Sequence, residues 1–253
     1  MLLLYVHRLL SMLCLLLDRR RLLPELPPLL LSGARMPRSK PVPVGLPRSQ
    51  QVAWQRTYAS TPYHRLPWFS PRAYPWVREA VEERWLRRGM RALDVGCGAG
   101  TNALFLARSG LRTTGIDLAP AAIAAAKARA ARQGLSVDFR PADALRLPFP
   151  RARFDALVDV GCYHTIPTAL RRAYSVELAR VARAGARYVL AWVGRESGQP
   201  FGPPHRPSLE ETTAAFEEEF LFLRTQFSPA RRGSFAEYRA ILERRARPRP
   251  AAR

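Results

Sequence analysis

The middle of the chain alternates short apolar runs with longer segments in which apolar residues recur at helical spacing. The first apolar run, Arg91–Val95, ends at a glycine-rich turn. Glycine also follows several of the helical segments, where it is a common terminator. Further strands are predicted at Arg112–Ile116, Leu135–Arg140, Phe154–Val158 and Arg187–Val193, with helices at Thr101–Ser109, Pro120–Gln133 and Thr168–Arg183. This alternation predicts a parallel sheet with helices on both faces.

The flanking segments extend this pattern. Ser70 and Pro71 are a typical helix start, and apolar residues then recur at helical spacing, so we predict a helix over Pro71–Arg88. After a loop at Gly194–Pro207, a helix is predicted from about Ser208, with its glutamates exposed. Two last strands are predicted at Phe220–Phe227 and Ala236–Leu242, joined by a turn at Arg231-Arg232-Gly233. The expected fold is α/β, a Rossmann-like, mostly parallel seven-stranded sheet.

The first 35 residues differ from the rest. The leucine-rich run Leu2–Leu17 is interrupted by His7 and Arg8 and is shorter than the roughly 20 apolar residues that span a bilayer. Three interpretations stay open: translation that begins at Met36, an amphipathic helix on a membrane surface, or a cleaved targeting segment. We therefore divide the chain into an extension (1–35), a proline-rich linker (36–53), one domain (54–245) and a basic tail (246–253).

The net charge of the chain raises the question of a nucleic-acid partner. The 253 residues carry a net charge of +21, which is typical of nucleic-acid-binding proteins. However, all but two of the 41 basic residues are arginine, and with 23 prolines this composition also fits a coding bias. The basic residues are spread along the chain, so we predict no specific nucleic-acid partner. The three cysteines have no disulfide or metal-binding spacing, so we expect a reducing, cytoplasmic location and no metal ion.

The glycine turn carries the main chemical signal. Gly96, Gly98 and Gly100 directly follow a strand, where ligands of open α/β sheets bind. The second strand ends near Asp117, about 20 residues later, at the spacing expected for a carboxylate that accepts hydrogen bonds from ribose hydroxyls. Asp143 follows the third strand, where it can meet an adenine amino group. Together these features indicate a nucleoside ligand.

These three elements, in this order and spacing, resemble the class I S-adenosylmethionine-dependent methyltransferases. The resemblance implies S-adenosylmethionine as the cofactor: Asp94 and the glycine backbone would face its methionine part, Asp117 its ribose, and Asp143 with Ala144 its adenine. The expected cofactor-binding residues are Trp68, Asp94, Gly96, Cys97, Gly98, Gly100, Asn102, Asp117, Leu118, Asp143 and Ala144.

The segment after the fourth strand indicates the acceptor. It runs from Asp159 to Pro167 and lacks the Asn/Asp-Pro-Pro-aromatic motif of nucleic-acid amino-methyltransferases and the Pro-Cys nucleophile of cytosine C5 enzymes. Instead it resembles the thiopurine-methyltransferase-like branch, which implies a small-molecule acceptor such as a thiol or another heteroatom nucleophile. The alternatives are an acceptor in RNA or protein, for which arginines should gather beside the pocket, and a non-catalytic cofactor-binding protein.

Each side chain expected near the acceptor has both a functional and a structural interpretation. Asp159, Tyr163 and His164 are the candidate catalytic residues. His164 is either a base or acceptor-orienting group, or a cap or packing residue. Asp159 fits loop ordering better than proton abstraction, and Tyr163 is a pocket wall or a core aromatic. Aromatic residues from Trp54 onward, Tyr58 and Trp68 among them, either cover the cofactor or pack on the sheet. His205 either closes over the acceptor or is exposed, and no nucleophilic role is expected for Cys162.

Overall fold

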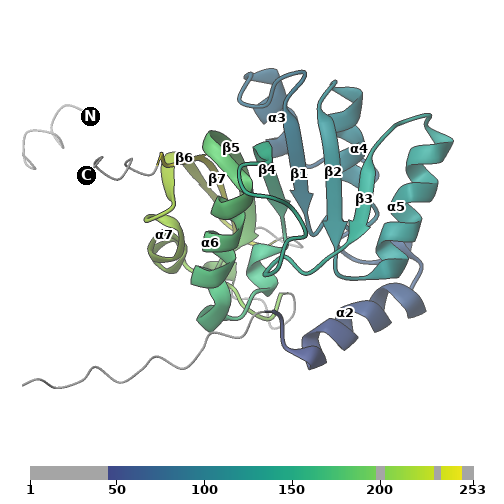
Figure 1. The fold of residues 1–253 in the computed structure, drawn as a ribbon. Coiled ribbons are helices and arrows are strands. Elements are labelled where there is room, and N and C mark those ends of the chain that lie inside the picture. Colours follow the sequence, from purple (N-terminus) through teal and green to yellow (C-terminus); the bar gives the residue numbers. More distant parts are fainter. Residues whose placement is uncertain (1–44, 198–202, 231–234, 247–253) are drawn as a thin grey trace, which may run out of the picture. The chain divides into compact units, whose positions relative to one another are not determined.

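In a computed structural model of the chain, residues 45–197, 203–230 and 235–246 are described, and they contain one seven-stranded sheet (Figure 1). The strand order is β3-β2-β1-β4-β5-β7-β6, and β7 pairs antiparallel with both of its neighbours. The strands are β1 (Arg91–Val95), β2 (Arg112–Asp117), β3 (Asp138–Pro141), β4 (Phe154–Val160), β5 (Ala182–Val193), β6 (Phe220–Ser228) and β7 (Glu237–Arg244). The predicted Rossmann-like sheet is confirmed.

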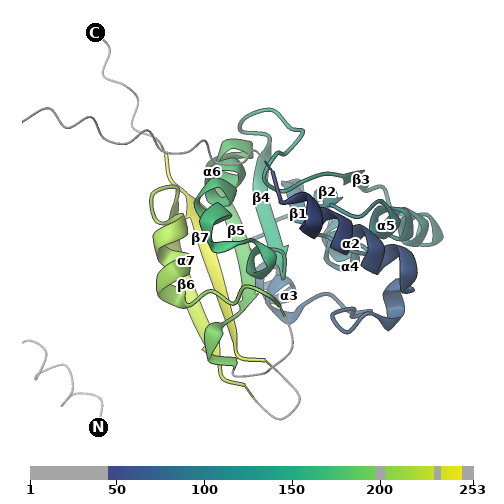
Figure 2. The ribbon, with the colours of Figure 1, turned by 90° about the horizontal axis from the view of Figure 1, so that it is seen from below.

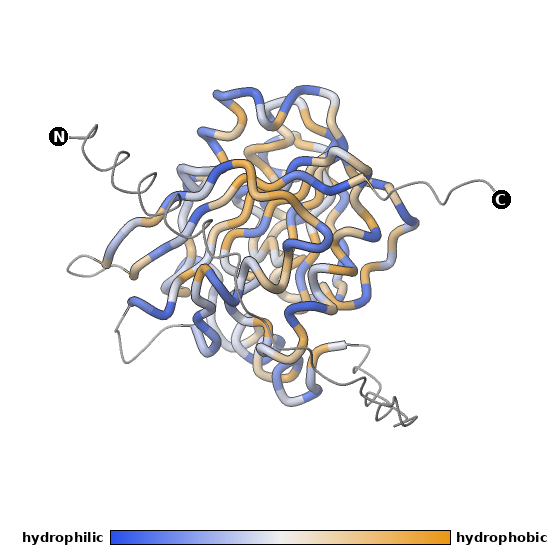
Figure 3. The backbone as a smooth tube through the Cα atoms, turned by 90° about the vertical axis from the view of Figure 1, so that its left-hand side faces the viewer, coloured by the Kyte–Doolittle hydropathy of each residue, from blue (hydrophilic) through white to orange (hydrophobic). Residues whose placement is uncertain are grey.

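Helices cover both faces of this sheet (Figure 2). They are α2 (Arg48–Ser60), α3 (Pro75–Glu82), α4 (Thr101–Arg108), α5 (Pro120–Arg132), α6 (Arg171–Val181) and α7 (Leu209–Phe216), with single 3₁₀ turns at Tyr63–Arg65, Tyr163–Thr165, Thr168–Leu170 and Arg195–Ser197. Residues of α6 and α7 pack on one face with Leu93 and Tyr188, and residues of α3 pack on the other with Ala92 and Val189. Hydrophobic stretches of the chain accordingly lie mainly in the interior (Figure 3).

Helix α3 begins four residues later than the sequence predicts. The predicted start was Pro71, but the helix starts at a second proline, Pro75. A proline disfavours helical backbone in the residue before it, and Tyr74 is accordingly extended, with φ −57° and ψ 135°. The segment from Ser70 to Tyr74 is instead a loop that hydrogen bonds to the start of α4, through Thr101 Oγ1 to the Ser70 carbonyl and through the Tyr74 amide to Asn102 Oδ1.

Strand β5 begins five residues before its predicted start at Arg187. Gly185 follows the helix predicted over Thr168–Arg183, as a terminating glycine would, but it lies inside this strand with φ +75°. The pairing with β4 shifts register between Phe154 and Ala156, so the extra residues form an irregular bulge. Glycine in a strand often marks such a bulge, and from sequence this signal is indistinguishable from a helix terminator. Helix α6 ends at Val181.

Two further predictions need correction. Helix α2 begins at Arg48, inside the segment expected to be linker. Glu219, expected on an exposed helix face, is buried and pairs with Arg244 at 3.1 Å, because α7 already ends at Phe216.

The predicted extension (1–35), most of the linker, the turn at Arg231-Arg232-Gly233 and nearly all of the tail lie outside the described residues. Within the described part of the chain, no helix is long and apolar enough to cross a membrane.

Candidate active site

The glycine turn joins β1 to α4 at the carboxyl edge of the sheet. Gly96, Gly98 and Gly100 have φ values of +66°, +53° and +79°, a region that side chains disfavour. The turn is tied to the neighbouring strand, since the Cys97 amide donates to the Ile116 carbonyl at 2.8 Å. A Cβ atom at Gly96 would lie 2.6 Å from the Cβ of Cys162, so the turn also packs against the loop after β4.

Asp117 lies at the end of β2, directly beside this turn. Its Oδ2 accepts from the Gly98 amide and its Oδ1 from the Ala119 amide, both at 2.9 Å. Burial raises the pKa of Asp117, while these amides act in the opposite direction. The Leu118 amide is a third donor to this carboxylate. A carboxylate has about four acceptor positions, so capacity for a ribose hydroxyl remains.

Asp94 is buried beneath the turn, with about 1% of its surface exposed. The Ala103 amide at the start of α4 donates to it, but Oδ2 has no hydrogen-bond partner. Burial raises its pKa to about 8. An unpartnered buried carboxyl oxygen at this point is an acceptor for a ligand that carries positive charge.

Asp143 follows β3 and is engaged by the chain segment before α2. Its Oδ2 accepts from the Leu46 amide at 2.8 Å, and its Oδ1 from the Leu145 amide at 2.9 Å. Ala144 is buried, and Leu118 packs against the main core. Leu46 therefore lies where the sequence led us to expect an adenine amino group.

Helix α2 and the loop after it lie over the glycine turn (Figure 2). The Tyr58 hydroxyl lies 2.8 Å from the position of a Cβ on Gly98, and Trp68 Nε1 donates to this hydroxyl at 3.1 Å. Between these elements is a cavity of about 360 Å³. Of the residues expected to bind the cofactor, Trp68, Gly96, Cys97, Gly98 and Asn102 line this cavity, whereas Asp94, Gly100, Asp117, Leu118, Asp143 and Ala144 do not.

Asp159 orders the loop after β4. It is fully buried, and its oxygens accept from the Cys162 amide at 2.8 Å and from the Tyr174 hydroxyl at 2.6 Å. The Tyr163 amide and the Tyr188 hydroxyl are further donors. With its lone pairs occupied and no access to the cavity, Asp159 is in no position to abstract a proton from an acceptor. These contacts favour the loop-ordering alternative for Asp159.

The two neighbouring candidates are also held in the structure. Nδ1 of His164 accepts from the Val193 amide at 3.0 Å, and burial lowers the pKa of His164 to about 3. The proton of the neutral ring is then on Nε2, so His164 is a donor and not a base at neutral pH. The Tyr163 ring is fully buried against Tyr174 and Phe216, which makes it a core aromatic. For both residues these contacts favour the packing alternative.

Sequence reasoning missed other parts of the site. His205 is partly exposed and does not line the cavity. The cavity is lined by Arg72 and Arg78, together with Tyr63, Phe69 and Tyr74. The aromatic-rich composition of this segment was the one signal that pointed here.

Comparison with known proteins identifies the chemistry. A family profile described as a methyltransferase domain matches residues 92–185. The 2-heptyl-1-hydroxyquinolin-4(1H)-one methyltransferase of Mycobacteroides abscessus is 32% identical over 157 residues, which cover 60% of this chain and 68% of that protein. This chain belongs to the S-adenosylmethionine-dependent methyltransferases.

One further relative agrees with the assignment, and a solved structure shares the fold of this methyltransferase. The ubiquinone biosynthesis O-methyltransferase of Rhodopseudomonas palustris is 29% identical over 58% of this chain and 67% of its own length. The fold matches 1,6-didemethyltoxoflavin-N1-methyltransferase of Burkholderia thailandensis, solved with S-adenosylhomocysteine, with a TM-score of 0.64 at 20% identity over 81% of this chain and 92% of that one.

S-adenosylmethionine is thus the cofactor of this methyltransferase, and the residues at the turn fit it. The cavity runs along the glycine turn, Asp117 has spare acceptor capacity, and Asp94, beneath the turn, has a buried oxygen without a hydrogen-bond partner. When bound, the cofactor supplies an electrophilic methyl group.

Proposed function

We propose that this methyltransferase acts on a small molecule through an oxygen, sulfur or nitrogen atom that loses its proton readily. The observation that carries the proposal is the composition of the cavity beside the glycine turn. Among the described residues that line it, none is Asp, Glu or His. The lining is aromatic and basic, with Tyr63, Phe69 and Tyr74 beside Arg72 and Arg78.

Methyl transfer from a sulfonium is an in-line displacement. A lone pair of the acceptor forms the new bond to carbon, and the electron pair of the broken carbon–sulfur bond stays on sulfur. The protein contributes alignment and exclusion of water. Because Asp159 and His164 are engaged elsewhere, the acceptor has to reach its ionised form without either of them. Acidic hydroxyls, such as phenols and N-hydroxy groups, and thiols meet this requirement.

The relatives support a small acceptor. The name of the Mycobacteroides abscessus enzyme specifies a hydroxyquinolinone, and that of the Rhodopseudomonas enzyme an oxygen acceptor in ubiquinone biosynthesis. We therefore favour a planar aromatic molecule with an acidic hydroxyl, with a thiol as the alternative. The thiopurine-methyltransferase-like branch remains a hypothesis, since the residues that suggested it, Asp159 to His164, order the loop in this structure.

For the cofactor, we propose that its methionine part lies along Gly96–Gly100 and that Asp117 accepts from the ribose hydroxyls. Asp143 and Ala144 would take the adenine once Leu46 gives up its hydrogen bond to Asp143. Substituting Asp117→Ala should weaken S-adenosylhomocysteine binding by about 1–3 kcal/mol, because the ribose loses a charged acceptor. Isothermal calorimetry measures this, and an unchanged affinity would show that the ribose lies elsewhere.

A labelled-methyl assay tests the acceptor class. The full chain, labelled S-adenosylmethionine and separate pools of phenols, N-hydroxy heteroarenes, small thiols, total RNA and a protein extract would be incubated in parallel. We expect label in a small-molecule pool. Label confined to the RNA or protein pool would refute the small-molecule proposal, and binding of cofactor without any labelled product would favour a non-catalytic role.

A further inference from the structure

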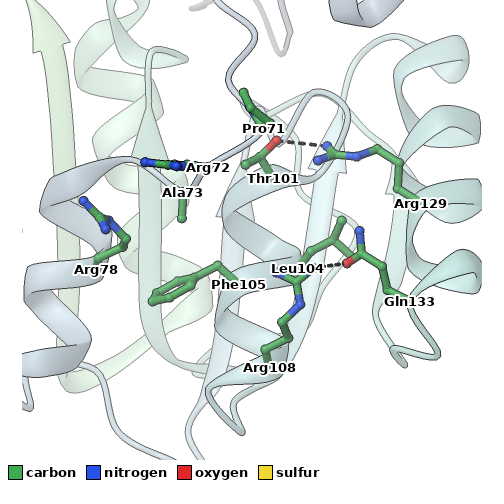
Figure 4. Close-up of a pocket in the computed structure, with 10 residues that line it drawn as sticks. All are labelled: Pro71, Arg72, Ala73, Arg78, Thr101, Leu104, Phe105, Arg108, Arg129 and Gln133. Atoms are coloured by element: carbon green, nitrogen blue, oxygen red, sulfur yellow. Dashed lines mark hydrogen bonds between the residues drawn. The ribbon is translucent and has the colours of Figure 1, made fainter.

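A second cavity, of about 250 Å³, lies on the outer side of α4 and is lined by four arginines, Arg72, Arg78, Arg108 and Arg129 (Figure 4). Arg72 and Arg78 approach it from the loop before α3 and from α3 itself, Arg108 from the end of α4, and Arg129 from α5. Elements far apart in sequence thus bring four positive charges to one concave surface.

No carboxylate compensates this charge. None of the four arginines forms an ion pair with a carboxylate of the described residues, although ten other arginines do. The cavity lining contains no Asp or Glu, and its other polar groups are Thr101 and Gln133. Grouping like charges is unfavourable, so a function is needed to explain it.

Arg129 shows that the charge is built into the fold. It is about 92% buried, and one of its nitrogens, Nη1, donates to the Ala99 carbonyl at 2.6 Å and to Thr101 Oγ1 at 2.9 Å. Its guanidinium also lies over the rings of Tyr63 and Phe69. Burial and the neighbouring arginines lower its pKa, as expected for a cation that lacks an anionic partner. A buried guanidinium of fixed geometry is suited to an oxyanion.

We propose that this arginine cavity binds a phosphate or diphosphate group of a small molecule. The guanidinium groups would donate charge-assisted hydrogen bonds to its oxygens. Thr101 and Gln133 accept from Arg129 and Arg108 and so orient these two arginines, and the amide nitrogen of Gln133 is a further donor at the cavity. Arg72, Arg78 and Thr101 also line the cavity at the glycine turn, so the two cavities adjoin. The phosphate group is thereby held next to the methyl-transfer site, and its binding does not depend on the acceptor proposed above.

The shape favours a small ligand over a nucleic acid. Non-specific nucleic-acid binding uses an extended basic surface that contacts successive phosphates. Here the charges converge on a cavity of about 250 Å³.

Calorimetric titration of inorganic pyrophosphate into the full chain, saturated with S-adenosylhomocysteine, tests the proposal. We expect one saturable site whose affinity falls with salt. Arg108→Gln should weaken it about tenfold, because one charge-assisted contact is lost. Arg108 is exposed and lines only this cavity, so the variant should fold normally. Arg112→Gln, an equal charge change at an exposed arginine that lines neither cavity, is the matched control and should bind as the wild type does.

Three outcomes would overturn it: absence of saturable binding, equal weakening in Arg108→Gln and Arg112→Gln, or binding of pyrophosphate to the cofactor-free chain alone. Binding of a short single-stranded RNA is measured in the same way. If RNA binds with the same dependence on Arg108 and pyrophosphate fails to displace it, the ligand is a nucleic acid and the small-molecule class is wrong. None of these readouts involves methyl transfer, so the result is independent of the acceptor proposal.

Discussion

At the scale of single residues, the hydrogen bond from the Val193 amide fixes which nitrogen of His164 carries the proton. The sequence places a histidine near the transferable methyl, and in isolation a base role is reasonable. What decides against it is a contact between residues 29 positions apart, which no local pattern contains. Asp159 is similar: its position at the end of β4 is predictable, but its bonds to Tyr174 and Tyr188 are not.

His164 can be tested with two variants. The Oδ1 atom of asparagine takes nearly the position of Nδ1, so His164→Asn should keep the bond to Val193 and retain activity, whereas His164→Ala should lose about 1 kcal/mol of unfolding free energy. Turnover and urea denaturation measure the two effects. If His164 were the base, both variants would lose about 10²-fold or more in turnover.

Asp94 makes stability depend on pH. Its pKa is raised by burial from 3.8 to about 8, so the folded chain holds this proton more tightly than the unfolded chain. The free energy of unfolding should therefore fall as pH rises from about 4 to about 8. Burial also raises the pKa of Asp159, to about 6, with the same sign, so the range from pH 6 to pH 8 reports mainly on Asp94.

Asp94→Asn removes this titration. We predict that the ligand-free variant loses less stability than the wild type between pH 6 and pH 8 and is the more stable of the two at pH 8. Urea denaturation at both values measures the difference. Asp138→Asn, at an exposed carboxylate paired with Arg140, is the control and should keep the wild-type slope. Parallel slopes for wild type and Asp94→Asn would refute a raised pKa.

At the scale of elements, the glycine turn is constrained by its own backbone and by α2 above it. Gly98→Ala places a Cβ 2.8 Å from the Tyr58 hydroxyl, whereas Gly134, with a similar φ of +62°, has no atom within 4 Å of that position. In both variants, backbone strain lowers the free energy of unfolding by about 1 kcal/mol. We predict that only Gly98→Ala weakens S-adenosylhomocysteine binding, by about tenfold in calorimetry. Equal affinities in the two variants would show that Tyr58 does not pack on the cofactor-binding turn.

The elements themselves were predictable to different degrees. Strands β1 and β2 and helices α4 and α5 follow the hydrophobic pattern closely, because their apolar faces meet the sheet directly. Helix α2 was missed because none of its residues is buried, so its sequence carries little amphipathic signal. The late start of α3 could have been predicted from Pro75, whereas no local sequence signal distinguishes the bulge at Gly185 from a helix end.

At the scale of the whole molecule, the fold and the cofactor could be predicted from the sequence, but the residues that line the two cavities could not. Glycines and carboxylates at successive strand ends are local signals, and they suffice for the fold and the cofactor. The cavity is made by α2, the aromatic loop and the turn together, and the arginine cavity by α3, α4 and α5. The net charge of +21 looked scattered along the chain, yet folding gathers four of its arginines.

The central claim is that this methyltransferase acts on a small acceptor that ionises by itself. The most direct test is the pH dependence of kcat/KM for two acceptors of similar shape whose pKa values differ by about two units. We predict that activity falls below the pKa of each acceptor, so that the midpoints differ by about the same two units. A common midpoint for both acceptors would reveal a base on the protein and contradict the account.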